Sequence, residues 1–204
     1  ISGATSSTYT LTQAEVGKAI TVAVNYTDGE GTSESVLSAA SAAVTNTNDP
    51  VSGAVSITGT ATQGQVLTAD ASGLSDPDGV GAFSYVWKAD GTTISGATGS
   101  TYTLTQAEVG KTITVTASYT DGGGTVESVQ SSATSAVANV NDDPTGTVTI
   151  TGTVSQGETV TANVSALADA DGLGTLSYQW KADGTDISGA TSSTYTLTQA
   201  EVGK

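Results

Sequence analysis

The sequence contains no cysteine, methionine, histidine or arginine, and these absences limit the chemistry that the chain can perform. Without cysteine or histidine the chain has no thiolate nucleophile, no Ser-His-Asp triad and no zinc site with nitrogen and sulfur ligands. It also forms no disulfide, a fact that does not by itself distinguish the cytosol from the exterior. Carboxylates and hydroxyl groups are the chemical groups that remain.

Long apolar runs are missing as well. No segment approaches the ~18 apolar residues that a membrane span requires, and no charged-then-apolar signal segment stands at the beginning. Because the sequence opens in the middle of a repeated pattern, a targeting signal would lie outside these residues. We therefore expect no direct membrane insertion by this part of the protein.

Basic residues are scarce, because five lysines stand against 20 acidic residues and give a formal net charge of -15 at pH 7. This charge repels the phosphates of nucleic acids and of anionic membrane surfaces, so we expect neither as a partner. Cations are the expected ligands.

A repeat of 93 residues organises the whole sequence. The motif ISGAT begins at Ile1, Ile94 and Ile187, and the segment STYTLTQAEVGK that follows is identical in all three copies. A repeat of this length is a domain and is too long for one turn of a solenoid. We predict that residues 1–49 hold the later strands of one repeat, residues 50–142 a complete repeat, and residues 143–204 the earlier part of the next.

Within one repeat, apolar residues alternate with threonine and serine, which is the pattern of strands with one buried face. Turn signals such as Asp90-Gly91 and Asp121-Gly122 separate these segments. The pattern predicts an all-β, antiparallel sandwich of about seven short strands. The predicted inward residues are Val55 and Ile57; Leu67 and Ala69; Phe83, Tyr85 and Trp87; Tyr102 and Leu104; Ile113, Val115, Ala117 and Tyr119; and, in a last strand from about Val126 to Val137, Val129, Ala133 and Val137.

The segment WKADGTTISGATGSTYTLTQAEVGK, residues 87–111, resembles the stretch from strand C to strand F of immunoglobulin I-set domains. The shared features are a Trp, a DG hairpin, a Tyr-x-Leu motif and an acid-x-Gly motif. The resemblance implies tandem immunoglobulin-like sandwiches, although the cysteines that join strands B and F in those domains are absent. Ala69 and Ala117 would then be the small inward residues beside Trp87, a pattern usual in bacterial immunoglobulin-like repeats.

The aromatic residues invite a second interpretation, because tryptophan and tyrosine can stack on sugar rings. Tyr85, Trp87 and Tyr119 have, however, the inward parity of their aliphatic neighbours. A domain of this size with so few large residues needs them for its core. We therefore expect them to be buried.

Acidic residues recur in three clusters of each repeat. The B–C loop contains Asp76 and Asp78, and the junction between repeats, at residues 46–50 and 139–144, combines asparagine and aspartate with a proline that indicates an extended linker. The F–G loop contributes Asp121, followed by Glu127. The counterparts of these residues in the other copies are Asp169, Asp171, Asp28 and Glu34.

In such a sandwich the B–C and F–G loops lie at the end where the chain enters, so the three clusters are expected to converge. Their carboxylate, amide and carbonyl oxygens suit Ca²⁺, which takes six to eight oxygen ligands at ~2.3–2.6 Å, and without a cation the like charges would repel. The alternative is that these are ordinary solvated turns and a polar linker. The predicted calcium ligands are Asn48, Asp49, Asp76, Asp78, Asp121, Asn141, Asp142, Asp169 and Asp171.

The junction also resembles the Asp-x-Asn-Asp-Asn-x-Pro linker of cadherins, although residue 46 is Asn and Pro50 follows Asp49 directly. With the period and the acidic junctions, it makes the chain resemble the extender region of giant RTX-type bacterial surface adhesins and biofilm-associated proteins. The resemblance implies a secreted protein of the cell surface or exterior. Its repeats would contact neighbouring repeats of the same chain and hold a terminal binding module away from the cell.

Two other functions stay open from the sequence. Each repeat could be a glycan- or cell-binding adhesion module, although its loops carry no aromatic or arginine anchors. Asp76 and Asp78 could act as a general acid and base, as in glycoside hydrolysis, but they lie on a short repeated loop without a visible cleft. We predict that the chain is not an enzyme.

The two partial repeats at the ends allow two interpretations. Residues 1–49 and 143–204 together make one repeat, with the 18 residues from ISGAT to VGK present twice. Either the sequence is a window of a longer fibre, or neighbouring chains complement each other head to tail and generate a filament. The sequence alone does not choose between them.

Overall fold

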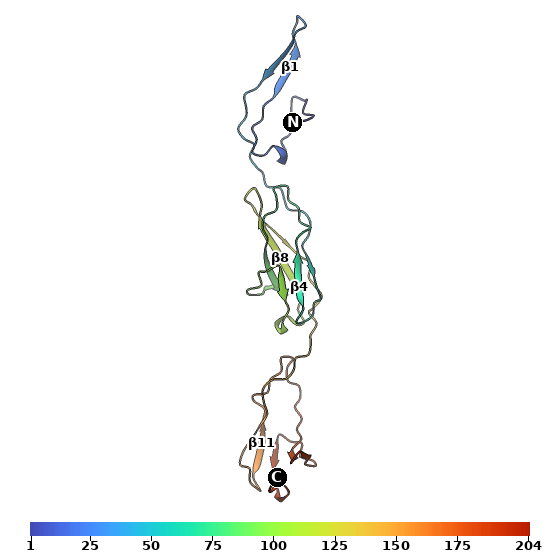
Figure 1. The fold of residues 1–204 in the computed structure, drawn as a ribbon, viewed down its shortest axis with the longest axis vertical. Helices are drawn as coiled ribbons and strands as arrows, with labels where there is room; N and C mark the ends of the chain where they lie inside the picture. The colour runs from blue at the N-terminus through green and yellow to red at the C-terminus, as the bar shows by residue number, and fades with distance from the viewer. The chain divides into compact units, whose positions relative to one another are not determined.

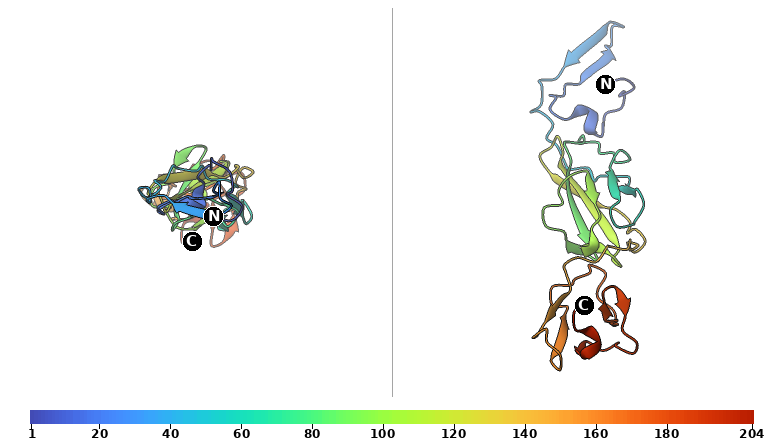
Figure 2. Two further views of the ribbon diagram at one scale, coloured as in Figure 1. Left: turned by 90° about the horizontal axis from the view of Figure 1, so that it is seen from above. Right: turned by 60° about the horizontal axis from the view of Figure 1, so that its bottom comes forward.

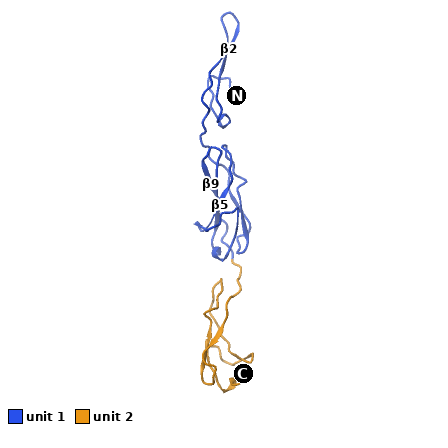
Figure 3. Ribbon diagram, turned by 60° about the vertical axis from the view of Figure 1, so that its left-hand side comes forward, with its two compact units in different colours: residues 1–138 blue, residues 139–204 orange.

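The computed structural model describes residues 1–204 as two compact units, residues 1–138 and residues 139–204 (Figure 3). The predicted boundaries at residues 49/50 and 142/143 stay predictions. The chain is all-β, as predicted, and no helix has the length and apolar character needed to cross a membrane. The helical segments are three short 3-10 turns of the repeated sequence QAE: η1 (Gln13–Glu15), η2 (Gln106–Glu108) and η3 (Gln199–Glu201).

Residues 50–142, the predicted complete repeat, contain a sandwich of two antiparallel sheets (Figure 1). One sheet has the strand order β3-β4-β7, and the other has the order β6-β5-β8-β9. This arrangement confirms the predicted β-sandwich. The bounds are β3 (Ser56–Thr58), β4 (Val66–Asp70), β5 (Ser84–Ala89), β6 (Thr92–Thr93), β7 (Thr101–Thr103), β8 (Ile113–Thr120) and β9 (Val126–Gln130).

The apolar alternation decides which face of each strand is buried. In β8, residues Ile113, Val115, Ala117 and Tyr119 point into the core, while the intervening threonines and serine lie on the outer face. The pairing of β5 with β8 places Trp87 opposite Val115. A shift of one residue in this register would turn the whole apolar row of β8 outward, so the alternation fixes the pairing.

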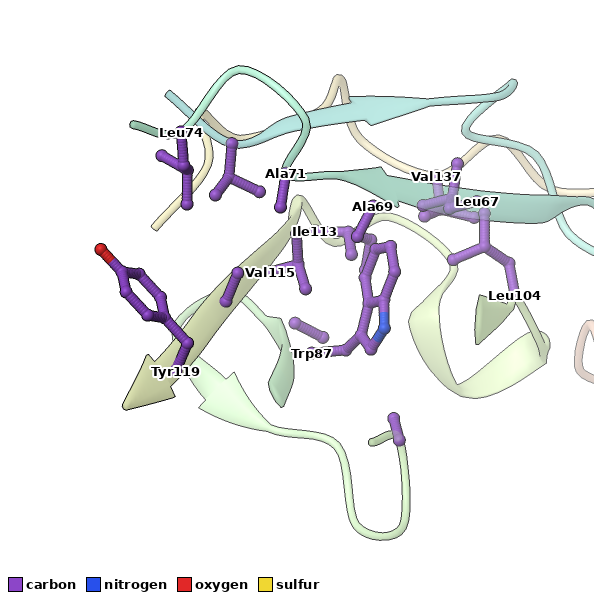
Figure 4. Close-up of a cluster of buried hydrophobic side chains, with 14 residues drawn as sticks. Leu67, Ala69, Ala71, Leu74, Trp87, Leu104, Ile113, Val115, Tyr119 and Val137 are labelled. Carbon is purple, nitrogen blue, oxygen red and sulfur yellow. The ribbon is translucent and has the colours of Figure 1, made fainter. Parts of the chain in front are cut away.

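Trp87 is the largest side chain in the core and is fully buried. Figure 4 shows its ring beside Ala69, and Ala117 is also buried, as the resemblance implied. The indole Nε1–H donates to the Gly99 carbonyl at 2.9 Å, which satisfies the polar atom of the ring. Tyr119 is buried and Tyr85 is partly buried against the same core, so the aromatic residues are core residues.

The last strand differs from the prediction, because β9 ends at Gln130 and Ala133 is exposed. After Gln130 the chain stays beside β8 because two side-chain hydroxyl groups accept hydrogen bonds from its backbone. Ser131 Oγ accepts from the Val115 N–H and Thr134 Oγ1 from the Ile113 N–H, both at 3.0 Å. The hydrogen-bonding residues, Ser131 and Thr134, are therefore three positions apart. The prediction that Ala133 points inward, which assumed alternation at every second residue, was wrong.

Residues 1–49 contain the hairpin of β1 (Ala23–Thr27) and β2 (Ser33–Leu37), which lie side by side in Figure 2. One period of 93 residues later, the same positions form the end of β8 and all of β9. Residues 139–204 contain one sheet with the order β10-β11-β14 and a separate hairpin. The bounds are β10 (Thr149–Thr151), β11 (Thr159–Asn163), β12 (Lys181–Ala182), β13 (Thr185–Asp186) and β14 (Thr194–Thr196).

Candidate metal centre

The B–C loop, between β4 and β5, presents two buried carboxylates. The Asp78 N–H donates to Asp76 Oδ1 at 2.9 Å, and the Gly79 N–H donates to the Asp76 carbonyl at 3.0 Å. Gly79 has a φ of +94°, which closes the turn in a conformation that favours glycine. Asp76 and Asp78 are only 9% and 8% exposed.

The F–G loop, between β8 and β9, brings a third buried carboxylate to the same place. Asp121 is 6% exposed, and its Oδ1 accepts from the Thr125 N–H at 2.7 Å. The Gly122 N–H donates to the Asp78 carbonyl at 3.0 Å and joins the two loops. A Cβ at residue 122 would lie 2.5 Å from that carbonyl oxygen, so this close approach requires glycine.

Three carboxylates converge into what we call the carboxylate cluster, Asp76, Asp121 and Glu127. Each has one oxygen within 4.8 Å of an oxygen of the other two. Asp121 Oδ2 is buried without a hydrogen-bond partner, and so is Oδ1 of the neighbouring Asp78. No lysine forms an ion pair with any of these four acids, since the ion pair of the structure joins Lys181 to Asp186.

The geometry of the carboxylate cluster fits Ca²⁺. Two oxygen atoms that bind one Ca²⁺ at ~2.3–2.6 Å can lie at most about 5 Å apart, and the cluster meets that limit. Buried carboxylate oxygens without a donor are costly unless a cation or proton compensates them. The unpartnered oxygens of Asp78 and Asp121 therefore indicate where a cation would be held.

The junction before the complete repeat bonds to these acids. The Asn48 side-chain amide donates to Glu127 Oε1 at 3.0 Å, and the Asp49 N–H donates to Asp78 Oδ2 at 2.8 Å. Asn46 lies against the F–G loop, because a Cβ at residue 123 would lie 2.5 Å from its Nδ2. The linker, the B–C loop and the F–G loop thus meet at one end of the repeat.

The second junction repeats part of this arrangement inside residues 139–204. The Asp142 N–H donates to Asp171 Oδ2 at 2.8 Å, and the Asp171 N–H donates to Asp169 Oδ1 at 2.9 Å. Here the Asn139 side chain also donates to Asp171, at 2.8 Å, whereas the corresponding oxygen of Asp78 has no partner. The amide of Asn141 donates to the Asp142 carbonyl at 3.1 Å.

The predicted ligands thus fall into two groups. Asn48, Asp49, Asp76, Asp78 and Asp121 lie in one hydrogen-bonded network, and Asn141, Asp142, Asp169 and Asp171 belong to the second junction. Whether any of them binds calcium stays a prediction. The structure adds Glu127, which is not among the predicted ligands, to the residues whose carboxylates converge.

Tyr119 is a further member of the site that the sequence did not indicate. Its hydroxyl donates to Asp76 Oδ2 at 2.6 Å. Burial, and then the hydrogen bond and charge of Asp76, raise the pKa of Tyr119 above its ordinary value of 10. Tyr119 lies on the inward face of β8, two residues before Asp121. In the sequence this position predicts burial in the core, and its nearness to Asp121 is the signal that could have placed it at the site.

Comparison with known proteins identifies no relative. No family model, curated protein or solved structure matches this chain. The candidate site therefore rests on the geometry of the loops and on the chemistry of their oxygen atoms.

Tyr102 and Tyr119 predict a loss of stability in alkali. Burial and then the neighbouring Glu108 raise the pKa of Tyr102 to about 12, and the pKa of Tyr119 is raised as well. Because these folded-state pKa values lie above those of the unfolded chain, the stabilisation is present below pH ~10 and declines as the pH rises above it. Urea unfolding midpoints should fall from pH 9 to pH 11. The variant Tyr119→Phe should flatten that fall, and Tyr26→Phe, at the exposed counterpart, should not. Equal slopes in all three proteins would contradict the assignment.

Proposed function

We propose that this chain is a structural extender of a bacterial cell-surface adhesin or extracellular filament, and that Ca²⁺ bound at its repeat junctions stiffens it. The observation that carries the proposal is the carboxylate cluster beside two unpartnered buried carboxylate oxygens. The extracellular setting follows from the resemblance to RTX-type adhesins. The ion would be held by Asp76, Asp121 and Glu127, with Asp78 adjacent, and would supply charge neutralisation and fixed coordination.

The proposed stiffening of the junction depends on hydrogen bonds between the linker and the acids of the site. Asn48 bonds to Glu127 and Asp49 bonds to Asp78, so the linker is attached to the acids that would bind the cation. An ion that holds these carboxylates in place would also hold the linker in place, because the linker donates hydrogen bonds to Glu127 and Asp78. When the ion is removed, the cluster carries uncompensated like charges, which repel one another and loosen the attachment.

A glycan-binding function lacks exposed aromatic anchors in the complete repeat. Trp87 and Tyr119 are buried in the core, where they cannot stack on a sugar ring. The outer faces of the strands carry mostly threonine and serine. These observations favour a spacer.

Small-angle scattering of the polypeptide tests the stiffening. In Ca²⁺ the particles should show a longer and more sharply defined maximum dimension than in a chelator. The variant Asp78→Asn should remove most of that difference, because it removes a charge at the acceptor of the Asp49 N–H. Asp90→Asn is the matched control, since Asp90 accepts hydrogen bonds from Thr112, in the turn after β5, and not from the junction. Identical dimensions in Ca²⁺ and chelator would refute the proposed mechanism.

A further inference from the structure

Tyr119 lies where the core of the complete repeat ends and the carboxylate cluster begins. It is 3% exposed, and its ring packs edge-on against Phe83, with the ring centroids 5.5 Å apart and the ring planes at 80°. Figure 4 shows its hydroxyl at the end of the buried cluster, directed away from Trp87. The packing of the ring therefore fixes the direction in which the hydroxyl points.

Two donors hold the Asp76 carboxylate. The Tyr119 hydroxyl donates to Oδ2 at 2.6 Å, and the Asp78 N–H donates to Oδ1 at 2.9 Å. A distance of ~2.5–2.7 Å between a hydroxyl and a carboxylate oxygen is typical of a charge-assisted hydrogen bond, which is stronger than a bond between neutral groups. Because each oxygen has a donor, rotation of the carboxylate about its Cβ–Cγ bond would break both hydrogen bonds. Asp76 is therefore held in one orientation.

The carboxylate of Asp76 keeps lone pairs for a cation in this orientation. An ionised carboxylate has about four lone pairs, and the two donors use about two of them. One oxygen of Asp76 also lies within 4.8 Å of oxygen atoms of Asp121 and Glu127. The hydrogen bonds that orient Asp76 thus leave it able to bind a cation together with the other two acids.

The register of β8 with β9 places Tyr119 beside the other two acids as well. Tyr119 lies opposite Glu127, and residues directly opposite each other in an antiparallel pair have their side chains on the same face. Asp121 follows two residues later, directly after the end of β8. Tyr119 therefore neighbours one acid across the strand pair, one along the chain and one through its hydroxyl.

We propose that Tyr119 is a positioning residue of the cation site, whose hydroxyl holds Asp76 toward Asp121 and Glu127 and thereby sets the affinity for Ca²⁺. The proposal rests on the proposed function for the identity of the ion. Hydrogen-bond partners of metal ligands orient those ligands, and their loss typically weakens metal binding by ~10- to 100-fold. The affinity of the site consequently depends on the packing of the core as well as on the acids.

Calorimetric titration of the 204-residue polypeptide with Ca²⁺ tests the role of the hydroxyl. Tyr119→Phe should weaken binding by ~10- to 100-fold, because Asp76 loses one of its two donors. Tyr85→Phe is the matched control, since it removes the hydroxyl of a neighbouring core tyrosine that packs against Phe83 and does not bond to these acids. It should bind Ca²⁺ as tightly as the unmodified protein. Equal affinity of the two variants would overturn the proposal.

Tyrosine absorption provides a readout that a purely structural hydroxyl would not change. A Ca²⁺ ion on Asp76 withdraws charge from the acceptor of the Tyr119 hydroxyl, so binding should produce a tyrosine difference spectrum that saturates with the ion. At saturating Ca²⁺ the signal should persist in Tyr85→Phe and disappear in Tyr119→Phe. Ion binding without a tyrosine signal in the unmodified protein would refute the positioning role, even if Tyr119→Phe failed to fold.

Titration of the unmodified protein and of Asp121→Asn separates this proposal from the proposed function. If the unmodified protein bound no Ca²⁺, the proposed function would be refuted, and the positioning role with it. If Asp121→Asn lost the ion while Tyr119→Phe bound it as tightly as the unmodified protein, the cation site would stand and only the role of Tyr119 would be refuted. Weakened binding in both variants, with full binding in Tyr85→Phe, is the expected result.

Discussion

Calcium is expected to raise the melting temperature of the complete repeat by roughly 10 to 20 °C at a free concentration about 100 times its dissociation constant. A ligand at that excess adds ~2.7 kcal/mol of stability, which is large against the ~5–15 kcal/mol typical of a small domain. The physical cause is the compensation of buried carboxylates, of which Asp78 and Asp121 each have one oxygen without a partner. Calorimetry in Ca²⁺ and in chelator measures the shift.

The variant Asp121→Asn separates the loss of the site from general destabilisation. It keeps an oxygen to accept from the Thr125 N–H, removes one charge from the carboxylate cluster, and so should melt in chelator at least as high as the unmodified protein. Its response to Ca²⁺ should be lost. Asp90→Asn removes the same charge from the turn between β5 and β6 and should keep the full response. An unchanged calcium shift in Asp121→Asn would exclude this cluster as the binding site.

Much of the sandwich was predictable because its strands obey one simple rule. The alternation of Ile113, Val115 and Ala117 with polar residues fixed both the strand and its inward face. The rule fails after Gln130, where Ser131 and Thr134 hold the chain to β8 through their hydroxyl groups. An apolar pattern does not report such contacts, so the exposure of Ala133 could not be read from it.

The part of the candidate site that lies in turns could be predicted from the sequence. Asp76, Asp78 and Asp121 stand in or next to Asp-Gly turns, and turns at one end of a sandwich lie near one another. Glu127 lies within a strand, and its participation depends on the register of β8 with β9, which pairs it with Tyr119. The tyrosine hydroxyl lies 2.6 Å from Oδ2 of Asp76, which stands 43 residues earlier in the chain. Sequence spacing contains no measure of that distance.

The substitution Trp87→Ala is expected to be the most damaging single change in the complete repeat. Removing a fully buried tryptophan costs ~3–5 kcal/mol, because the core loses both the transfer free energy of the ring and the contacts around the cavity left behind. The Gly99 carbonyl also loses the donor that Trp87 provides at 2.9 Å. The calcium-sensitive calorimetric transition should therefore fall by more than ~10 °C.

The chain contains its own control for this substitution. Trp180 occupies the same position one period later and donates to the Ser192 carbonyl at 2.9 Å, but its ring is only partly covered. Trp180→Ala should therefore leave the calcium-sensitive transition in place, since that transition belongs to the complete repeat. If both substitutions lowered it equally, the stability of the repeat would not depend on the core around Trp87. The expected difference arises because the identical residue is enclosed between two sheets in one copy and lacks a β8-like strand in the other.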